Sequence, residues 1–199
     1  MSISTPDSHT PLPKDYRPPL HPDTLLKAGL GLGVVMVALA MVWVNLFRRG
    51  DLWQTLRVDS VWLALPGALA GLAFALTTWH VGRRLKATHQ IVVLLEQSID
   101  LSAMTVQHVV LFSLLAAVPE ELLFRGALQP EVGVLLASVI FGALHALTPL
   151  YFLYATCAGL LLGLLAAAAN GLLWAAIAAH FTIDLVMFLL LLQRRNHLF

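Results

Sequence analysis

Three ionisable residues, Glu120, Glu121 and Arg125, lie close together in a stretch that is otherwise apolar. A charge at the centre of a membrane-spanning helix costs about 2.5 to 3.5 kcal/mol, so such charges need partners or a cavity. Helical residues four apart differ by about 40° around the axis, whereas neighbours differ by about 100°. We therefore expect Glu121 and Arg125 to form a supporting ion pair. Glu120 then points elsewhere and stays free for chemistry.

Three more ionisable residues, His145, His180 and Asp184, follow in later apolar stretches. His180 and Asp184 are four apart, so Asp184 is expected to hold an imidazole N–H of His180 and fix its tautomer. Phe141, four residues before His145, is expected to wall the same side of a cavity. At about 1.5 Å per residue, Glu120 and these three groups fall within about 8 Å of one another in depth. They form one constellation if their helices are neighbours.

These residue types suit hydrolysis. A carboxylate can accept and return a proton, and imidazoles can orient water or stabilise an oxyanion. Glu120, His145 and His180 are equally a zinc set with an open fourth position. No His-Glu-x-x-His sequence is present to decide, so both a bare water and a divalent metal such as zinc stay open. His80 and His108 belong to no group and are expected to be structural.

The composition predicts an all-α, polytopic membrane helix bundle whose main partner is the lipid bilayer. Of 199 residues, 59% are hydrophobic and 12% are charged, against about 25% charged in soluble domains. The mean hydropathy is +0.82. The net charge of +1 and the short basic clusters beside apolar runs argue against nucleic-acid binding. Cys157, the one cysteine, is expected to be a small buried apolar residue.

Proline and span lengths divide the chain. Residues 1–22 hold six of the ten prolines and predict a disordered tail. About 20 apolar residues cross the hydrocarbon core, which predicts six spans at 28–47, 61–82, 101–128, 132–148, 150–169 and 171–192. Residues 83–100 predict an amphipathic interfacial helix. The expected units are the tail 1–22, an N-terminal pair of spans with the interfacial segment at 23–97, a four-helix catalytic core at 98–193 and a basic C-terminal tail at 194–199.

The distribution of Lys and Arg favours both termini in the cytoplasm, because eight of these residues then lie inside and three outside. With one helix per span, this orientation puts the membrane face nearest Glu120 on the outside.

Three motifs in order resemble those of the CAAX protease and bacteriocin-processing (CPBP, or Abi) family of intramembrane proteases. Residues 120–125 are similar to its Glu-Glu-x-x-x-Arg, residues 141–145 to its Phe-x-x-x-His, and residues 180–184 to its His-x-x-x-Asn/Asp. The resemblance covers about residues 98–193. It implies a peptidase of membrane-associated substrates, which in the branch of type II CAAX prenyl endopeptidases are prenylated proteins cut near the C-terminus.

By position in these motifs, the resemblance implies that Glu120 activates water, His145 helps to position it, and His180 with Asp184 stabilises the oxyanion. Glu121 and Arg125 would hold the site together. Asp184 departs from members with Asn there, and since a carboxylate is a poorer donor than an amide, its implied role is to orient His180. The family implies either a glutamate mechanism or a metalloprotease.

The leading hypothesis is an intramembrane endopeptidase in a bacterial cell membrane, acting on a membrane-associated, prenylated or C-terminally anchored protein or peptide. Members that act on prenylated proteins are expected to open toward the cytoplasm, which conflicts with the face predicted for Glu120. One alternative is a non-catalytic immunity or partner-binding protein of the same family. Another is a proton or ion carrier that uses the same carboxylates, disfavoured because no internal repeat is present.

Overall fold

The computed structural model describes residues 18–48 and 50–196. Among these residues the elements are helical, joined by turns and one isolated bridge, which confirms the all-α class. The α-helices are α1 (Pro22–Trp43), α2 (Ala64–Gly82), α3 (Lys86–Ser98), α4 (Val106–Glu121), α5 (Gln129–Leu144), α6 (Pro149–Ala168) and α7 (Trp174–Asn196). The π-helical segments are η1 (Val44–Arg48) and η4 (Leu122–Leu128), and the 3-10 segments are η2 (Leu52–Leu56) and η3 (Val58–Leu63).

Five continuous helical stretches in the described part of the chain are long and apolar enough to cross a membrane: Pro22–Arg48, Val58–Gly82, Val106–Leu144, Pro149–Ala168 and Trp174–Arg194. Four of them match single predicted spans. The fifth, Val106–Leu144, has 39 residues and contains both the third and the fourth predicted spans. The boundary expected at 129–131 lies close to the break that the structure has at Gly133, although α4, η4 and the start of α5 follow one another without a loop.

The chain reverses inside that long stretch at Gly133, whose φ of 80° and ψ of 165° are not helical. A positive φ is open to glycine at little cost. The helical part of α5 after Gly133 has eleven residues and is about 16 Å long, roughly half of the ~30 Å hydrocarbon core. α5 is therefore a half-length helix, not the full crossing that one helix per span requires.

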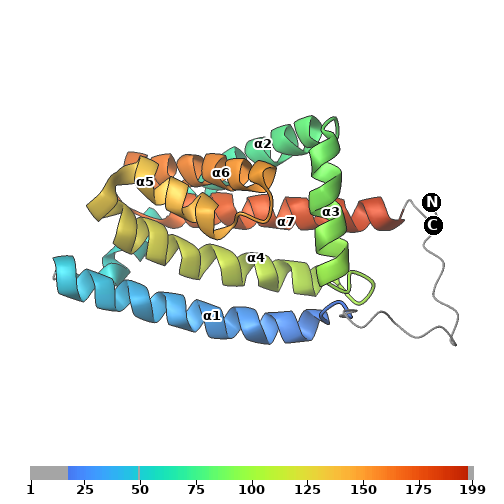
Figure 1. Cartoon of the computed structure of the whole chain (residues 1–199). Helices are drawn as coiled ribbons and strands as arrows, with labels where there is room; N and C mark the ends of the chain where they lie inside the picture. The colour runs from blue at the N-terminus through green and yellow to red at the C-terminus, as the bar shows by residue number, and fades with distance from the viewer. Residues whose placement is uncertain (1–17, 49, 197–199) are drawn as a thin grey trace, which may run out of the picture.

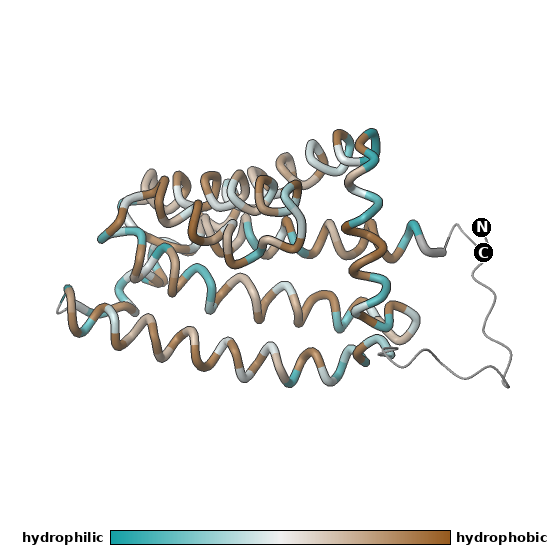
Figure 2. Tube along the Cα trace, viewed as in Figure 1, coloured by the Kyte–Doolittle hydropathy of each residue, from teal (hydrophilic) through white to brown (hydrophobic). Residues whose placement is uncertain are grey.

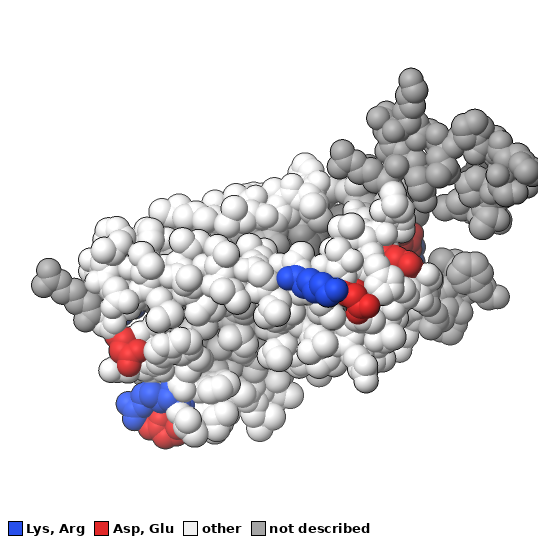
Figure 3. Space-filling view, turned by 90° about the horizontal axis from the view of Figure 1, so that it is seen from below, with Lys and Arg blue, Asp and Glu red and all other residues white. Residues whose placement is uncertain are grey.

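The long helices lie roughly along one direction, and α3 crosses one end of the bundle (Figure 1). The start of α1 and the end of α7 lie at this same end, which we call the α3 end. Hydrophilic residues gather along α3 and at the two ends of the bundle (Figure 2). The face in Figure 3 carries few charged side chains, and these lie toward its ends with uncharged surface between them. This distribution fits a bundle surrounded by lipid.

Two glycines of α2 bring it against the backbone of α7. A Cβ on Gly67 would collide with the backbone of Ala175, and one on Gly71 with that of Ala179. Close approach of this kind is typical of small-residue helix contacts in membranes. Because Ala179 precedes His180, the α2–α7 contact fixes the part of α7 that carries the histidine.

The second glycine contact joins α5 and α6. A Cβ on Gly159 would lie 3.2 Å from Cα of Ser138, and one on Gly163 would lie 2.7 Å from Oε1 of Gln129. The buried Gln129 also donates from Nε2 to the carbonyl of Gly163 at 3.0 Å. These contacts hold α5 and α6 together as a helical hairpin.

The amphipathic helix expected over 83–100 is present as α3, with Val92 buried and Leu95 and Ile99 packed on an apolar cluster. Of the tail predicted to be disordered, residues 1–17 lie outside the described residues. Its last residues differ from the prediction, because Leu20 exchanges backbone hydrogen bonds with Ser98 and Asp100 at 2.9 and 3.0 Å, and Pro22 begins α1. The backbone partners supplied by the α3–α4 turn order this end of the tail.

Candidate active site

Two features shape the helix that carries the glutamates. Thr105 caps α4 by accepting from the backbone N–H of His108, and Pro119 lies in its last turn. Gly33 of α1 leaves room for the proline ring, since a Cβ there would lie 3.0 Å from Cγ of Pro119. From Leu122 the helix widens into η4, and π-helical turns of this kind often occur at functional sites.

Glu121 lies at the centre of a fully buried group. Its Oε2 is 3.2 Å from Nε of Arg125, and neither side chain is exposed, so the expected ion pair is present. Its Oε1 accepts from Nδ1 of His180 at 2.9 Å. The contact is across 59 residues of sequence, and helical spacing could not reveal it. Glu121 therefore joins the end of α4 to α7 and fixes the ring of His180, the task expected of Asp184.

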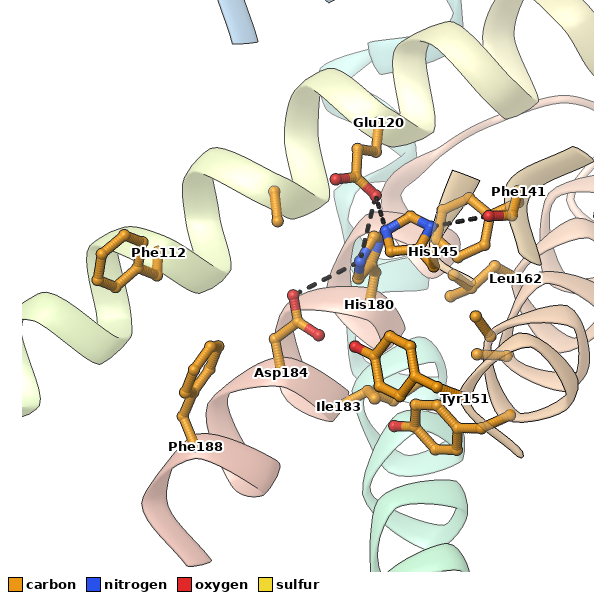
Figure 4. A pocket seen from close by; sticks show the side chains of 14 residues that line it. Phe112, Glu120, Phe141, His145, Tyr151, Leu162, His180, Ile183, Asp184 and Phe188 are labelled. Carbon is orange, nitrogen blue, oxygen red and sulfur yellow. Dashed lines mark hydrogen bonds and ion pairs between the residues drawn. The ribbon is translucent and has the colours of Figure 1, made fainter. Parts of the chain in front are cut away.

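Glu120 faces a different direction, toward the two histidines (Figure 4). Its Oε2 lies 3.8 Å from Nε2 of His145 and 3.8 Å from Nε2 of His180. This oxygen is buried and has no hydrogen-bond partner among the described residues. Asp184 approaches from α7, with Oδ2 at 3.5 Å from Nε2 of His180. The four side chains whose depths were predicted to match are thus brought together.

His145 comes from the end of the half-length α5. Its Nδ1 lies 2.8 Å from the carbonyl oxygen of Phe141. A carbonyl only accepts hydrogen bonds, so Nδ1 carries a proton, and in the neutral ring Nε2 is an acceptor aimed at Glu120. The ring of Phe141 stacks on His145 at 4.4 Å and meets His180 edge-on at 5.8 Å. Phe141 therefore lies between the two imidazoles. It forms part of the cavity wall, as the sequence predicted.

A cavity of about 240 Å³ adjoins this group. Its walls come from α4, α5, the α5–α6 loop, α6 and α7, with the side chains of Phe112, Ala116, Glu120, Phe141, His145, Tyr151, Tyr154, Ala155, Ala158, Leu162, His180, Ile183, Asp184 and Phe188. Tyr151 stacks on Tyr154, which in turn contacts Phe74 of α2, with both pairs of ring centres 5.7 Å apart. The cavity is mostly aromatic and aliphatic, with its polar groups on one side.

The cavity extends from Glu120 toward the α3 end. Phe112 lies between Glu120 and the start of α4, and Phe188 lies between Asp184 and the end of α7. Both rings also pack on the apolar cluster that includes Val92 of α3. The membrane face nearest Glu120 is therefore not the face toward which the cavity runs. With both termini in the cytoplasm, as predicted, a cavity of this direction runs toward the cytoplasm.

The described residues contain no group of three or more His, Cys, Asp or Glu side chains arranged to hold a metal ion. Nδ1 of His180 is hydrogen-bonded to Oε1 of Glu121, and its Nε2 lies 3.8 Å from Oε2 of Glu120 and 3.5 Å from Oδ2 of Asp184. The zinc set of Glu120, His145 and His180 stays a prediction, and no step below uses a metal.

The remaining sequence candidates lie elsewhere. His108 is bonded to Asp23 at 3.1 Å and to Thr105, and His80 contacts Arg84 at 2.8 Å, so both have structural contacts outside the cavity. Cys157 is exposed on α6. The expectation that it is buried is wrong, because it lies on the outer face of that helix, where lipid accepts a small apolar side chain.

Residues 102–186 match the family described as type II CAAX prenyl endopeptidase, Rce1-like. All three motifs lie within this segment. The match supports a CAAX protease family assignment for this segment. It confirms the resemblance to CPBP proteases, and with the apolar helices it identifies an integral membrane protein.

A curated relative is the "Uncharacterized protein YpbD" of Bacillus subtilis (strain 168), which is 41% identical over 88 residues. The aligned segment is 43% of this chain and 46% of the relative, so the chain spans just under half the length of the protein it matches. No solved structure matches.

Proposed function

We propose that the chain is an intramembrane endopeptidase, in which a water molecule held by Glu120 attacks a peptide bond of a membrane-associated protein. The observation that carries the proposal is the buried, unpartnered Oε2 of Glu120, which lies 3.8 Å from Nε2 of both His145 and His180 beside the cavity. A lone carboxylate oxygen between two imidazoles suits general acid–base chemistry. The family match supports a protease of the CAAX type.

In the proposed mechanism, Glu120 accepts a proton as the water oxygen bonds to the carbonyl carbon of the substrate. Nε2 of His145 accepts a hydrogen bond from the same water and orients it. The negative charge that develops on the carbonyl oxygen is stabilised by Nε2–H of protonated His180. Glu120 then returns the proton to the leaving nitrogen as the C–N bond breaks, which yields a carboxylic acid and an amine.

Glu121, Arg125 and Phe141 are proposed as positioning residues. The Glu121 carboxylate holds Nδ1–H of His180, which directs Nε2 into the cavity. Arg125 balances the buried Glu121 charge, and its guanidinium carbon lies 5.2 Å from the centre of the Phe141 ring. Asp184, with Oδ2 at 3.5 Å from Nε2 of His180, helps to keep a proton there.

We infer an orientation with the α3 end in the cytoplasm. Lys27, Arg83, Arg84, Lys86 and Arg194 lie at this end of the described chain, whereas Arg48 and Arg57 lie at the other. Lys and Arg are enriched on the cytoplasmic side of membrane proteins. The substrate then enters from the cytoplasmic half of the membrane and is a membrane-associated protein or peptide, with a lipid group or a C-terminal anchor as its membrane contact.

The proposal is tested by comparing membrane proteomes of cells that carry the wild-type protein or Glu120→Gln. We expect new peptide termini with wild type, and a loss of at least about 100-fold with Glu120→Gln, because general acid–base groups contribute about 10² to 10⁴ in rate. Glu96→Gln removes an exposed carboxyl on α3 and should cleave as wild type. Equal cleavage by Glu120→Gln would remove Glu120 from the mechanism.

A further inference from the structure

The charges around the cavity are not balanced. Glu120 and Asp184 line it, whereas none of its lining residues in the described part of the chain is Lys or Arg. Arg125, the nearby cation, is fully buried behind the ring of Phe141 and is paired with Glu121. Three carboxyl groups thus face one guanidinium, and an excess of negative charge remains even when His180 carries a proton.

Asp184 is the acidic group with room for a substrate contact. Its side chain is 27% exposed, against 15% for Glu120. One oxygen contacts His180, and the carboxyl group lies on the cavity side of α7 between His180 and Phe188 (Figure 4). A substrate segment that follows the cavity toward the α3 end must pass this carboxyl group soon after leaving Glu120.

The described wall residues on the α3 side of Asp184 offer no cation to a substrate carboxylate. Beyond Asp184 the lining consists of the phenylalanines at 112 and 188 and of small or aliphatic residues, with the tyrosines on the α6 side. A carboxylate held here would lose its hydration and meet a like charge instead of a cation. Like charges brought together at a binding site cost several kcal/mol.

We propose that the cavity selects substrate segments that are neutral or basic next to the scissile bond, and that Asp184 is the residue that excludes acidic ones. The inference rests on the proposed peptidase function and narrows its substrate. It predicts cleavage within an apolar or basic segment and disfavours a free C-terminal carboxylate within a residue or two of the cut. A basic side chain at this point would pair with Asp184.

The experiment uses the full chain purified in detergent and a pool of apolar transmembrane peptides. Each peptide carries a single Lys, Gln or Glu at a varied position and ends in either a free carboxylate or an amide. Products are counted by mass spectrometry. We expect wild type to cut peptides with Gln or Lys near the cleaved bond at least about tenfold faster than the matched Glu peptides. Amidated ends close to the cut should be favoured similarly.

Asp184→Asn should reduce the Gln-to-Glu ratio several-fold whatever its overall rate, and Glu96→Gln should leave the ratio unchanged. Equal cutting of Glu and Gln peptides by wild type would overturn the inference without any variant. An unchanged ratio in folded Asp184→Asn would remove Asp184 as its cause. If wild type gives no product that Glu120→Gln lacks, the peptidase proposal itself fails. This outcome differs from one in which wild type gives products but cuts Glu and Gln peptides equally, which overturns only the charge selection.

Discussion

At the residue scale, the two adjacent glutamates have separate surroundings. Glu120 has an unpartnered oxygen at the cavity, whereas Glu121 is fully buried between Arg125 and His180. The rotation of about 100° between adjacent helical residues thus directs Glu120 to the cavity and Glu121 to its buried partners. Substitutions at the two positions should have different effects on stability.

Glu121→Gln should lower the free energy of unfolding by about 3 to 5 kcal/mol, because it leaves the Arg125 charge buried without a partner. Glu120→Gln removes no paired charge of this kind and should unfold close to wild type. Thermal unfolding in detergent measures both. Adding Arg125→Met to Glu121→Gln should recover part of the loss; a double variant as unstable as the sum of the single ones would argue against the pair.

Removal of metal ions tests the water mechanism at the same scale. If Glu120 activates a bare water, cleavage by purified protein is expected to continue at an unchanged rate after extensive dialysis against a chelator. The product assay of the peptide pool measures this. Activity that is lost on chelation and restored by zinc would instead support Glu120, His145 and His180 as ligands.

Residue types and spacing predicted the members of this site better than their contacts. The pair Glu121–Arg125 follows from helical angles, and the common depth of Glu120, His145 and His180 follows from counting residues. The hydrogen bond between Glu121 and His180 does not, because it depends on how α4 and α7 face each other. Helical spacing favoured Asp184 as the residue that holds the imidazole of His180, because spacing can identify only partners on the same helix.

At the element scale, α7 is held by α2 through the contacts of Gly67 and Gly71. We predict that Gly71→Ala lowers the free energy of unfolding by about 1 to 3 kcal/mol, since the added methyl group must push the helices apart. Activity should fall as well, because Ala179 precedes His180. Gly31→Ala is the matched control, as nothing lies within 4 Å of its added Cβ. Equal stability and activity of the two variants would contradict this role of the α2–α7 contact.

The α2–α7 contact is a feature that hydropathy patterns cannot predict. Gly67 and Gly71 lie in an apolar run and look like any other small residues, whereas their partners on α7 are about a hundred positions away. Hydropathy located the apolar stretches to within a few residues, because span length follows from bilayer thickness. It placed a boundary beside the reversal at Gly133, but it could not show that α5 is only half as long as a full crossing.

At the scale of the whole molecule, the orientation can be measured. In a Cys157→Ala background, a cysteine at Gln97 beside the α3 end should react with a membrane-impermeant thiol reagent only when the cytoplasmic face is accessible. A cysteine at Gln54 at the opposite end should react from outside. Both positions are exposed. The reverse pattern would invert the bundle and direct the cavity outward.

The non-catalytic alternative is also decided at this scale. A membrane immunity or partner-binding protein of the same family would keep its phenotype in cells when Glu120 or His145 is replaced. A proton or ion carrier would instead give liposome fluxes that depend on Glu120. The peptidase proposal expects the phenotype to be lost with Glu120→Gln and no such flux.

The half-length α5 also affects how the reaction is supplied. Its end leaves residues 145–148 in turns beside Glu120, at a depth where lipid tails offer no hydrogen bonds to the backbone. Non-helical backbone at such depth is tolerated where it is buried in protein or lines a water-filled cavity, and His145 of this segment lines the cavity. The end of α5 at His145 would thus admit water into the hydrocarbon layer. The same break in the helix that places His145 in the site would also supply the water that the reaction consumes.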